Sequence, residues 1–156
     1  GQVIDESLDI MVWALSQSDP AQWLPLEKSS FRDETFELIT SNDGEFKHIL
    51  DRYKYADRHP EHSADYYRDQ ACHYLQSLEQ RLIHHRYLMT STISFADIAI
   101  WPFIRQFAHV DKPWFDGTHL PGLQRWLDDF LQSTLFAHVM NKYPEWHTDQ
   151  PPIIFA

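Results

Sequence analysis

Cysteine and glycine are both scarce in this chain of 156 residues. Cys72 is the single cysteine and has no second cysteine for an intrachain disulfide, so a reducing compartment, the cytoplasm, is the simpler expectation. The four glycines are too few for the tight hairpin turns of a many-stranded sandwich or barrel. Both scarcities favour a helical intracellular protein.

Long apolar runs and a surplus of positive charge are also missing. No stretch reaches about 18 apolar residues, so the sequence predicts no membrane-spanning helix. Thirteen basic against 23 acidic residues give a net charge of −10, which argues against nucleic acid and anionic membranes as partners. The start of the chain also lacks the basic and apolar segments of a secretory signal.

Apolar residues make up 43% of the chain and aromatic residues 15%, which excludes intrinsic disorder. The length fits one domain, and there is no internal repeat and no βαβ alternation. Apolar residues recur at helical spacing in most segments. We therefore predict an all-α bundle of about five or six helices around a buried central helix.

The spacing of apolar residues also locates the individual helices. A turn is predicted at residues 41–44, between two helical pieces, because Ser, Asn, Asp and Gly cluster there. Residues 93–110 are apolar on every side, which predicts the buried central helix. The predicted helices cover residues 8–15, 31–40, 46–53, 67–82, 93–110, 121–131 and 135–140.

A capping signature opens the predicted central helix. Ser94 can accept from the N–H of Asp97, and the Asp97 carboxylate can reach back to the N–H of Ser94. Ile93 and Ile98 flank the pair as a hydrophobic staple. Because a buried helix start has four N–H groups without water, this motif is predicted to stabilise the fold.

Other reactive residues predict no separate site. Cys72 lies mid-helix and is expected to be a buried, inert thiol. The pairs His59 and His62, and His84 and His85, lack a third ligand at a recognised spacing, so no metal site is predicted.

Arg105 lies within the apolar central helix and needs a partner, because an unpaired buried charge is very costly. Asp97, Asp128 and Asp129 are all candidates. The sequence does not choose among them.

The ordered motifs resemble the C-terminal domain of the glutathione S-transferases. Ser94-x-x-Asp97, opening an apolar helix that contains Trp101-Pro102, resembles the central helix of that domain. Residues 120–127 resemble the Pro-x-Leu-x-x-Trp helix that follows it there. The resemblance implies the same helical fold over residues 18–145.

Residues 50–55 look like the long helix that walls the active-site cleft in that family. The resemblance implies that Arg52, Tyr53 and Tyr55 line the site of a hydrophobic substrate. Packing of an amphipathic helix explains the same residues without a site, and this alternative stays open.

Residues 3–10 resemble the last strand and last helix of the thioredoxin-like domain of that family. An acid followed by Ser binds the γ-glutamyl end of glutathione there, which implies this role for Glu6 and Ser7. A carboxylate suits an α-ammonium, and a helix start suits a carboxylate. The alternative is that Asp5, Glu6 and Ser7 only cap a helix.

The resemblance divides the chain into three parts. Residues 1–17 correspond to a remnant of the thioredoxin-like domain, residues 18–25 to a linker and residues 26–156 to the helical domain. The catalytic Tyr, Ser or Cys of the family precedes all of these, so we assign no catalytic residue, no cofactor and no metal, and expect no transferase activity from this chain alone.

A parent protein of this kind conjugates or transfers glutathione, its co-substrate, through an activated thiolate. The helical domain then forms the wall for a hydrophobic or electrophilic small molecule, together with dimer contacts. Two alternatives remain: a non-enzymatic protein-interaction module, and half of a glutaredoxin-like thiol reductase.

The first predicted helix also bears on association. Leu8, Met11 and Leu15 lie on one apolar stripe, which the thioredoxin-like domain covers in the family. An exposed stripe of this kind favours self-association, so a homodimer or larger assembly is expected.

Overall fold

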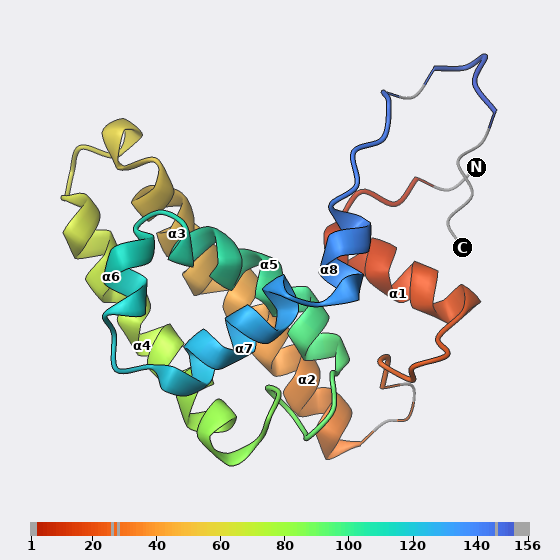
Figure 1. Cartoon of the computed structure of the whole chain (residues 1–156), viewed down its shortest axis with the longest axis horizontal. Coiled ribbons are helices and arrows are strands. Elements are labelled where there is room, and N and C mark those ends of the chain that lie inside the picture. Colours follow the sequence, from red (N-terminus) through yellow and green to blue (C-terminus); the bar gives the residue numbers. More distant parts are fainter. Residues whose placement is uncertain (1–2, 26, 28, 146, 152–156) are drawn as a thin grey trace.

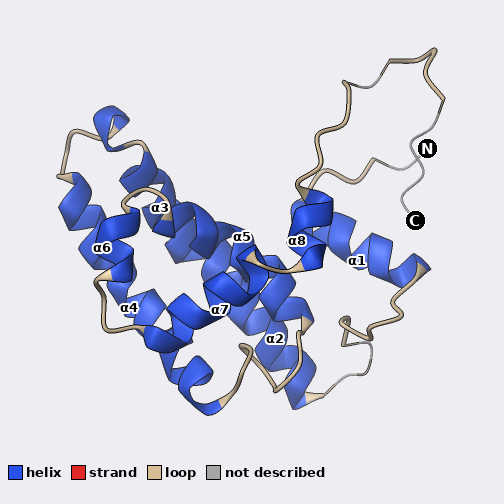
Figure 2. Cartoon of the chain, in the orientation of Figure 1, coloured by secondary structure: helices blue, strands red, loops and turns tan. Residues whose placement is uncertain are grey.

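A computed structural model shows a helical chain and describes residues 3–25, 27, 29–145 and 147–151 (Figures 1 and 2). No strand occurs among these residues, and the predicted all-α class is confirmed. None of the helices within the described ranges combines the length and apolar character needed to cross a membrane. The α-helices are α1 (Ser7–Gln17), α2 (Ser30–Ser41), α3 (Lys47–Lys54), α4 (Ala64–His84), α5 (Phe95–Ala108), α6 (Lys112–Asp116), α7 (Pro121–Leu131) and α8 (Thr134–Val139).

Helix α5 lies at the centre of the bundle, as its apolar sequence predicts. It packs against α2, α3 and α7, while α4 packs along α3 and α7 (Figure 1). Nine of its 14 residues are buried, which explains why it has no polar face. The largest fully buried side chains of the core are Trp126, Phe46, Phe95, Phe107, Phe115, Ile39, Leu75, Leu78, Leu88, Ile100, Ile104 and Leu123.

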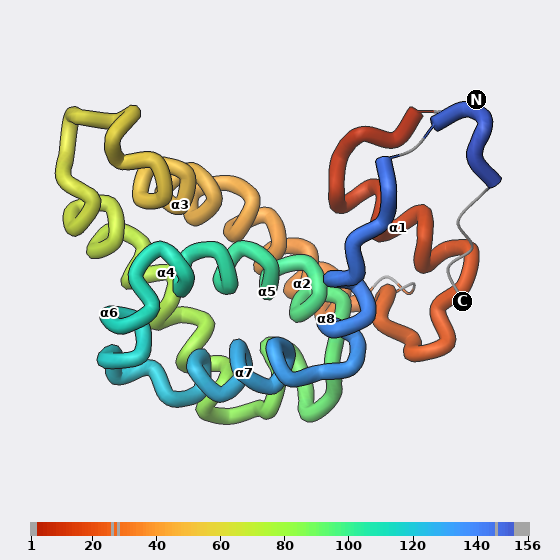
Figure 3. Tube along the Cα trace, turned by 45° about the horizontal axis from the view of Figure 1, so that its top comes forward, coloured from red at the N-terminus to blue at the C-terminus, as the bar shows by residue number. Residues whose placement is uncertain are grey.

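The turn predicted at residues 41–44 is not formed. Helix α2 instead continues through a π-helical segment, Asn42–Phe46, directly into α3 (Figure 3). Asn42 is buried and accepts a hydrogen bond of 3.5 Å from the Tyr74 hydroxyl, and the Phe46 ring stacks on the Tyr74 ring with centroids 4.6 Å apart. Packing against α4 therefore overrides the local turn preference.

Helix α1 lies at the end of the molecule that also holds α8, away from α6 (Figures 1 and 3). Val3 and Ile4, expected at the end of a strand, lie in a loop, because the described residues provide no strand to pair with them. The stripe expected to be exposed on α1 is half-buried against the core. The large exposed apolar side chains of α1 are instead Ile10 and Trp13, which are 45% and 55% exposed.

The segment between α1 and α2 is ordered by one side chain. The Asp19 carboxylate accepts from the N–H of Trp23 (2.9 Å) and of Leu24 (2.8 Å). The turn between them places Gln22 in the left-handed region, with φ of 53°. Residues 19–24 thus form a defined turn, and Trp23 lines a cavity together with side chains of α5, α7 and α8.

Candidate functional site

The start of α5 is held by a carboxylate that is completely shielded from solvent. Ser94 and Asp97 form a capping box, and Asp97 is 0% exposed. The Ser94 N–H donates to Asp97 Oδ2 at 2.9 Å, and the Ser94 hydroxyl donates to the same oxygen at 2.6 Å. Short bonds to an ionised acceptor are the strong class of hydrogen bond.

The other oxygen of Asp97 joins two further parts of the chain. Asp97 Oδ1 accepts from the N–H of Leu88 and from the indole N–H of Trp126, each at 2.9 Å. Burial raises the pKa of this carboxyl, and the hydrogen bonds from Leu88, Ser94 and Trp126 only partly offset that effect. Asp97 therefore fastens the loop after α4, the start of α5 and the middle of α7 at one point.

A second buried carboxylate caps the start of α7. Glu79 projects from α4 and is only 4% exposed. Its two oxygens accept from the N–H of Gly122 (3.0 Å) and of Leu123 (2.7 Å). A Cβ at Gly122 would lie 3.1 Å from both oxygens and 3.0 Å from Leu82 Cβ, so glycine allows α4 and α7 to approach.

A hollow of about 370 Å³ lies between the C-terminal parts of α3 and α5. Lys54 closes one side, and its Nζ donates to Gln106 Oε1 at 3.2 Å. His109 follows the end of α5, and its Nδ1 lies 2.8 Å from the backbone oxygen of Arg105. The lining residues, none of them acidic, are Lys54, Arg105, Gln106, His109 and Val110.

In the part of the chain that the structure describes, Arg105 pairs with none of the three aspartates that the sequence suggested as partners. Its guanidinium carbon lies 5.2 Å from the ring centroid of Phe136 on α8. Its buried Nε has no hydrogen-bond partner among the described residues. A cation above an aromatic ring is favourable, but the ring supplies no hydrogen-bond acceptor in the guanidinium plane.

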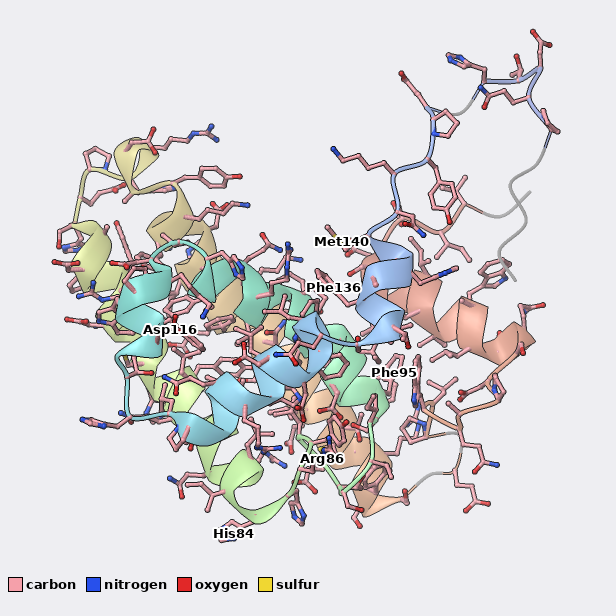
Figure 4. All side chains as sticks on the ribbon, viewed as in Figure 1. His84, Arg86, Phe95, Asp116, Phe136 and Met140 are labelled. Atoms are coloured by element: carbon pink, nitrogen blue, oxygen red, sulfur yellow. The ribbon has the colours of Figure 1, made fainter. Side chains whose placement is uncertain are left out.

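Phe136 also lines an apolar cavity of about 280 Å³. Phe136 projects from α8 toward the middle of the molecule, above α5 (Figure 4). The cavity lining contains no charged side chain and comprises Trp23, Ile98, Trp101, Pro102, Phe130, Leu135, Phe136 and Val139. The cationic hollow and this cavity are therefore adjacent through the contact between Arg105 and Phe136.

The three side chains expected to line a substrate site on α3 point in different directions. Tyr53 is 4% exposed, and its ring packs 5.0 Å from that of Phe107 in the core, where burial raises its pKa. Tyr55 lies beneath the cationic groups of Lys54 and Arg58.

Arg52 lies in a third place. It lines a pocket of about 460 Å³ between α3 and α4, which also contains Glu45, His48, Glu61, His62 and Tyr67. The side chain at the end of α3 that lines the hollow is thus Lys54, which the sequence analysis did not single out.

Glu6 and Ser7 lie at the start of α1, and both are exposed. Glu6 is the N-cap residue, but its side chain makes no capping hydrogen bond. The Glu6 carboxylate is thus not occupied by the helix that it precedes.

The remaining reactive residues form no site in the described ranges. Burial raises the pKa of the Cys72 thiol, which lies mid-helix with Sγ 3.5 Å from the backbone oxygen of Arg68. His59 pairs with Asp51 at 3.7 Å, and its neighbour His62 stacks on Tyr66. No group of three or more potential metal ligands converges in the part of the chain that the structure describes.

Residues 64–129, from α4 to α7, match the family model of the glutathione S-transferase C-terminal domain. This helical region is similar to the C-terminal domain of the glutathione S-transferases. Among solved structures, a glutathione transferase from Burkholderia graminis, with two glutathione molecules bound per subunit, is 21% identical with a TM-score of 0.67. The match covers 86% of this chain and 58% of that one, so the transferase-like domain spans little more than half of its neighbour. No curated protein sequence matched the chain.

Proposed function

We propose that this chain is the helical part of a glutathione transferase-like protein, in which it forms one wall of the site for the second substrate. The observation that carries the proposal is the family match over residues 64–129. In such a protein the thiolate of glutathione attacks an electrophile, and the helical part positions the electrophile beside it. The division of the chain at residues 17 and 25 and a cytoplasmic location belong to the same proposal.

Two features of the surface support this role. The hollow between α3 and α5 and the neighbouring apolar cavity offer a polar and an apolar surface side by side. Ligand sites commonly combine apolar walls with a few polar groups that set orientation. We assign the wall of the second substrate to Lys54, Arg105 and Phe136, in place of Arg52, which the resemblance implied and which lines a different pocket.

The glutathione end of the proposed site is assigned to Glu6 and Ser7. Their exposure and the unused Glu6 carboxylate support this assignment. Ile10 and Trp13 on the same helix expose apolar area, which supports contacts with a further domain or with a second copy of the chain.

A titration followed by NMR tests the proposal on the chain itself. Glutathione and S-hexylglutathione are added to the ¹⁵N-labelled protein, and we expect weak binding with a Kd of about 1–10 mM, since a millimolar Kd corresponds to only about −4 kcal/mol. Amides near Glu6 and near Lys54 should shift, and the hexyl chain should strengthen binding.

Matched variants locate the effect. Glu6→Gln should weaken glutathione binding several-fold, whereas Asp9→Asn, which removes an equal charge one turn further along α1, should change it little. If neither glutathione nor S-hexylglutathione shifts any amide, the proposal fails and the non-enzymatic interaction module becomes the better account.

A further inference from the structure

We infer that the pocket between α3 and α4 binds a free basic amino acid, with its α-carboxylate on Arg52, its α-ammonium on Glu61 and its cationic side chain on Glu45. The pocket has a volume of about 460 Å³, within the range of about 300–1,000 Å³ that is typical of small-molecule sites. It shares no lining residue with the hollow at Lys54 or with the apolar cavity at Phe136, so the inference does not rest on the proposed function.

Two helix faces and the loop between them form this pocket. Helices α3 and α4 pack against each other (Figure 1). Glu45, His48 and Arg52 are spaced at i, i+3 and i+7, so they lie on one face of the continuous helical segment that runs into α3. Tyr66 stands on α4, and Glu61 lies in the connecting loop. Charged groups of both signs thus surround one space.

Arg52 is the guanidinium of the pocket, and it is half-buried. Glu61 also lines the pocket, and its pKa is lowered, first by a hydrogen bond from its own backbone and then by the neighbouring His59, Tyr67 and Arg52. Arg52 and Glu61 attract each other without forming an ion pair. An α-amino acid carries a carboxylate and an ammonium on one carbon atom, so it can pair with both groups at once.

The second carboxylate of the pocket, that of Glu45, favours a ligand with a basic side chain. Glu45 is exposed and forms no ion pair with a described residue. It precedes Arg52 by seven residues, which is about 10 Å along the helix at a rise of about 1.5 Å per residue. The extended side chain of arginine or lysine covers a span of this order, and Ile49 between the two charges can pack against its methylene stem.

The balance of charge agrees with this ligand. With histidine counted as neutral, the lining contains two carboxylates and one guanidinium. Its net charge is therefore negative, whereas a basic amino acid carries a net positive charge. Pairing every charge of the ligand also pairs every charge of the pocket.

The tyrosine rings of α4 form a further wall of the pocket. Tyr67 is 5% exposed, and its hydroxyl lies 3.4 Å from Glu61 Oε2. The ring of Tyr66 is 43% exposed and nearly perpendicular to that of Tyr67, with centroids 5.6 Å apart. Because a cation is attracted to the face of a tyrosine ring, the exposed ring of Tyr66 also favours a cationic ligand.

The test uses L-arginine and three relatives, each of which lacks one of the recognised groups. Agmatine lacks the α-carboxylate, Nα-acetyl-L-arginine lacks the α-ammonium, and L-citrulline lacks the charge of the side chain. Each compound is titrated into the ¹⁵N-labelled full chain at low salt and followed by NMR. We expect L-arginine to bind with a Kd of about 1 mM and each relative to bind about fivefold more weakly, with amides near Arg52 and Tyr66 shifting.

Agmatine separates recognition from general attraction. It carries one more positive charge than L-arginine, so unspecific attraction to a chain with a net charge of −10 would make agmatine the tighter ligand. Recognition of the α-carboxylate by Arg52 predicts the opposite order.

Matched variants assign each contact. Glu45→Gln should weaken the binding of L-arginine about fivefold and leave that of L-citrulline unchanged. Glu37→Gln removes an equal charge from an exposed position of α2 outside the pocket, and should change binding less than about twofold. Arg52→Gln should weaken L-arginine about fivefold and leave agmatine unchanged, whereas Arg58→Gln, outside the pocket, should affect neither.

Three results would overturn the inference: agmatine binding as tightly as L-arginine, equal losses in Glu45→Gln and Glu37→Gln, or undiminished binding of Nα-acetyl-L-arginine. In the last case the pocket would accept the basic C-terminus of a peptide rather than a free amino acid. The outcome is distinguishable from that of the proposed function, because the amide shifts expected there lie near Glu6 and Lys54.

Discussion

Two sets of charged side chains in this molecule lie in opposite environments. The carboxylates of Asp97 and Glu79 are buried, and every one of their oxygens accepts at least one hydrogen bond. Lys54 and Arg105 lie at the surface hollow without a carboxylate partner among the described residues.

The difference separates scaffold from binding surface. A buried charge with all of its partners joins elements that are distant in sequence, and losing it leaves several donors unsatisfied. A surface cation without a carboxylate partner contributes little to stability and is available to a ligand. Substitutions in the two sets should therefore have opposite consequences. Five measurements test the scaffold, and the last measurement tests the surface set through Lys54.

The largest effect is expected from Asp97→Ala. Four donated hydrogen bonds lose their acceptor in a dry environment, so the free energy of unfolding should fall by about 3–5 kcal/mol. Urea unfolding measures the loss. Asp111→Ala is the control, because Asp111 caps only the short α6 through the N–H of Trp114 and should cost about 1 kcal/mol. Equal losses in the two variants would contradict the special role of Asp97.

Glu79→Ala comes next. It removes the acceptor of the first two N–H groups of α7, and we expect a loss of about 2–3 kcal/mol in the same assay. Glu37→Ala, at an exposed position of α2, should stay within about 0.5 kcal/mol of the wild type. An unchanged midpoint for Glu79→Ala would mean that water replaces the cap.

Two glycine variants sharpen the picture of this cap. Gly122→Ala places a methyl group against Glu79 and Leu82 and should cost about 1–3 kcal/mol. Gly44→Ala meets no atom within 4 Å in a helical segment and should stabilise by about 0.5–1 kcal/mol. Thermal unfolding of both variants shows which substitution stabilises the fold and which destabilises it. A stabilising Gly122→Ala would show that α4 and α7 are free to move apart.

The thiol of Cys72 offers a kinetic check on burial. Because burial raises its pKa, less thiolate forms at a given pH in the folded protein than in the unfolded chain. Ellman's reagent at pH 8 should therefore react about tenfold more slowly with the folded chain than with the chain in urea. Equal rates would place the thiol in open solvent.

The smallest expected effect is on how the free energy of unfolding depends on pH. Since the pKa of Asp97 is raised on folding, the folded state binds this proton more tightly than the unfolded state does. Its contribution to the free energy of unfolding therefore increases as pH falls through the folded pKa and decreases as pH rises. The stability of the wild type relative to Asp97→Asn should be greater at about pH 4.5 than at pH 7. The opposite trend would mean that the four hydrogen bonds lower the pKa of Asp97 by more than burial raises it.

Local features of the fold were predictable from the sequence. The Ser94–Asp97 pair is three residues apart, and helical spacing located α5 and α7. The two long-range donors to Asp97 were not predictable. Leu88 lies 9 residues before Asp97 and Trp126 lies 29 residues after it, and only the packing of the helices brings them together. The π-helical join of α2 and α3 also depends on packing against α4, which local turn preferences do not register.

The hollow was predictable only in part. Arg105 stood out as a charge within an apolar helix, and the sequence required a partner for it. A phenylalanine on α8 fills that role through its ring, which no charge-pairing rule anticipates. Tyr53 and Lys54 are adjacent in sequence, yet one faces the core and the other the hollow, because neighbouring helical residues point about 100° apart.

One unfolding experiment compares the two sets of charges most directly: urea denaturation of the wild type, of Lys54→Gln and of Asp97→Ala, each with and without S-hexylglutathione. A ligand that binds only the folded state raises the midpoint. We predict that Asp97→Ala lowers the ligand-free midpoint, whereas Lys54→Gln keeps the ligand-free midpoint of the wild type and loses most of the ligand-induced rise. A lowered ligand-free midpoint with the full rise retained would contradict the account, because Lys54 would then serve the fold rather than the ligand.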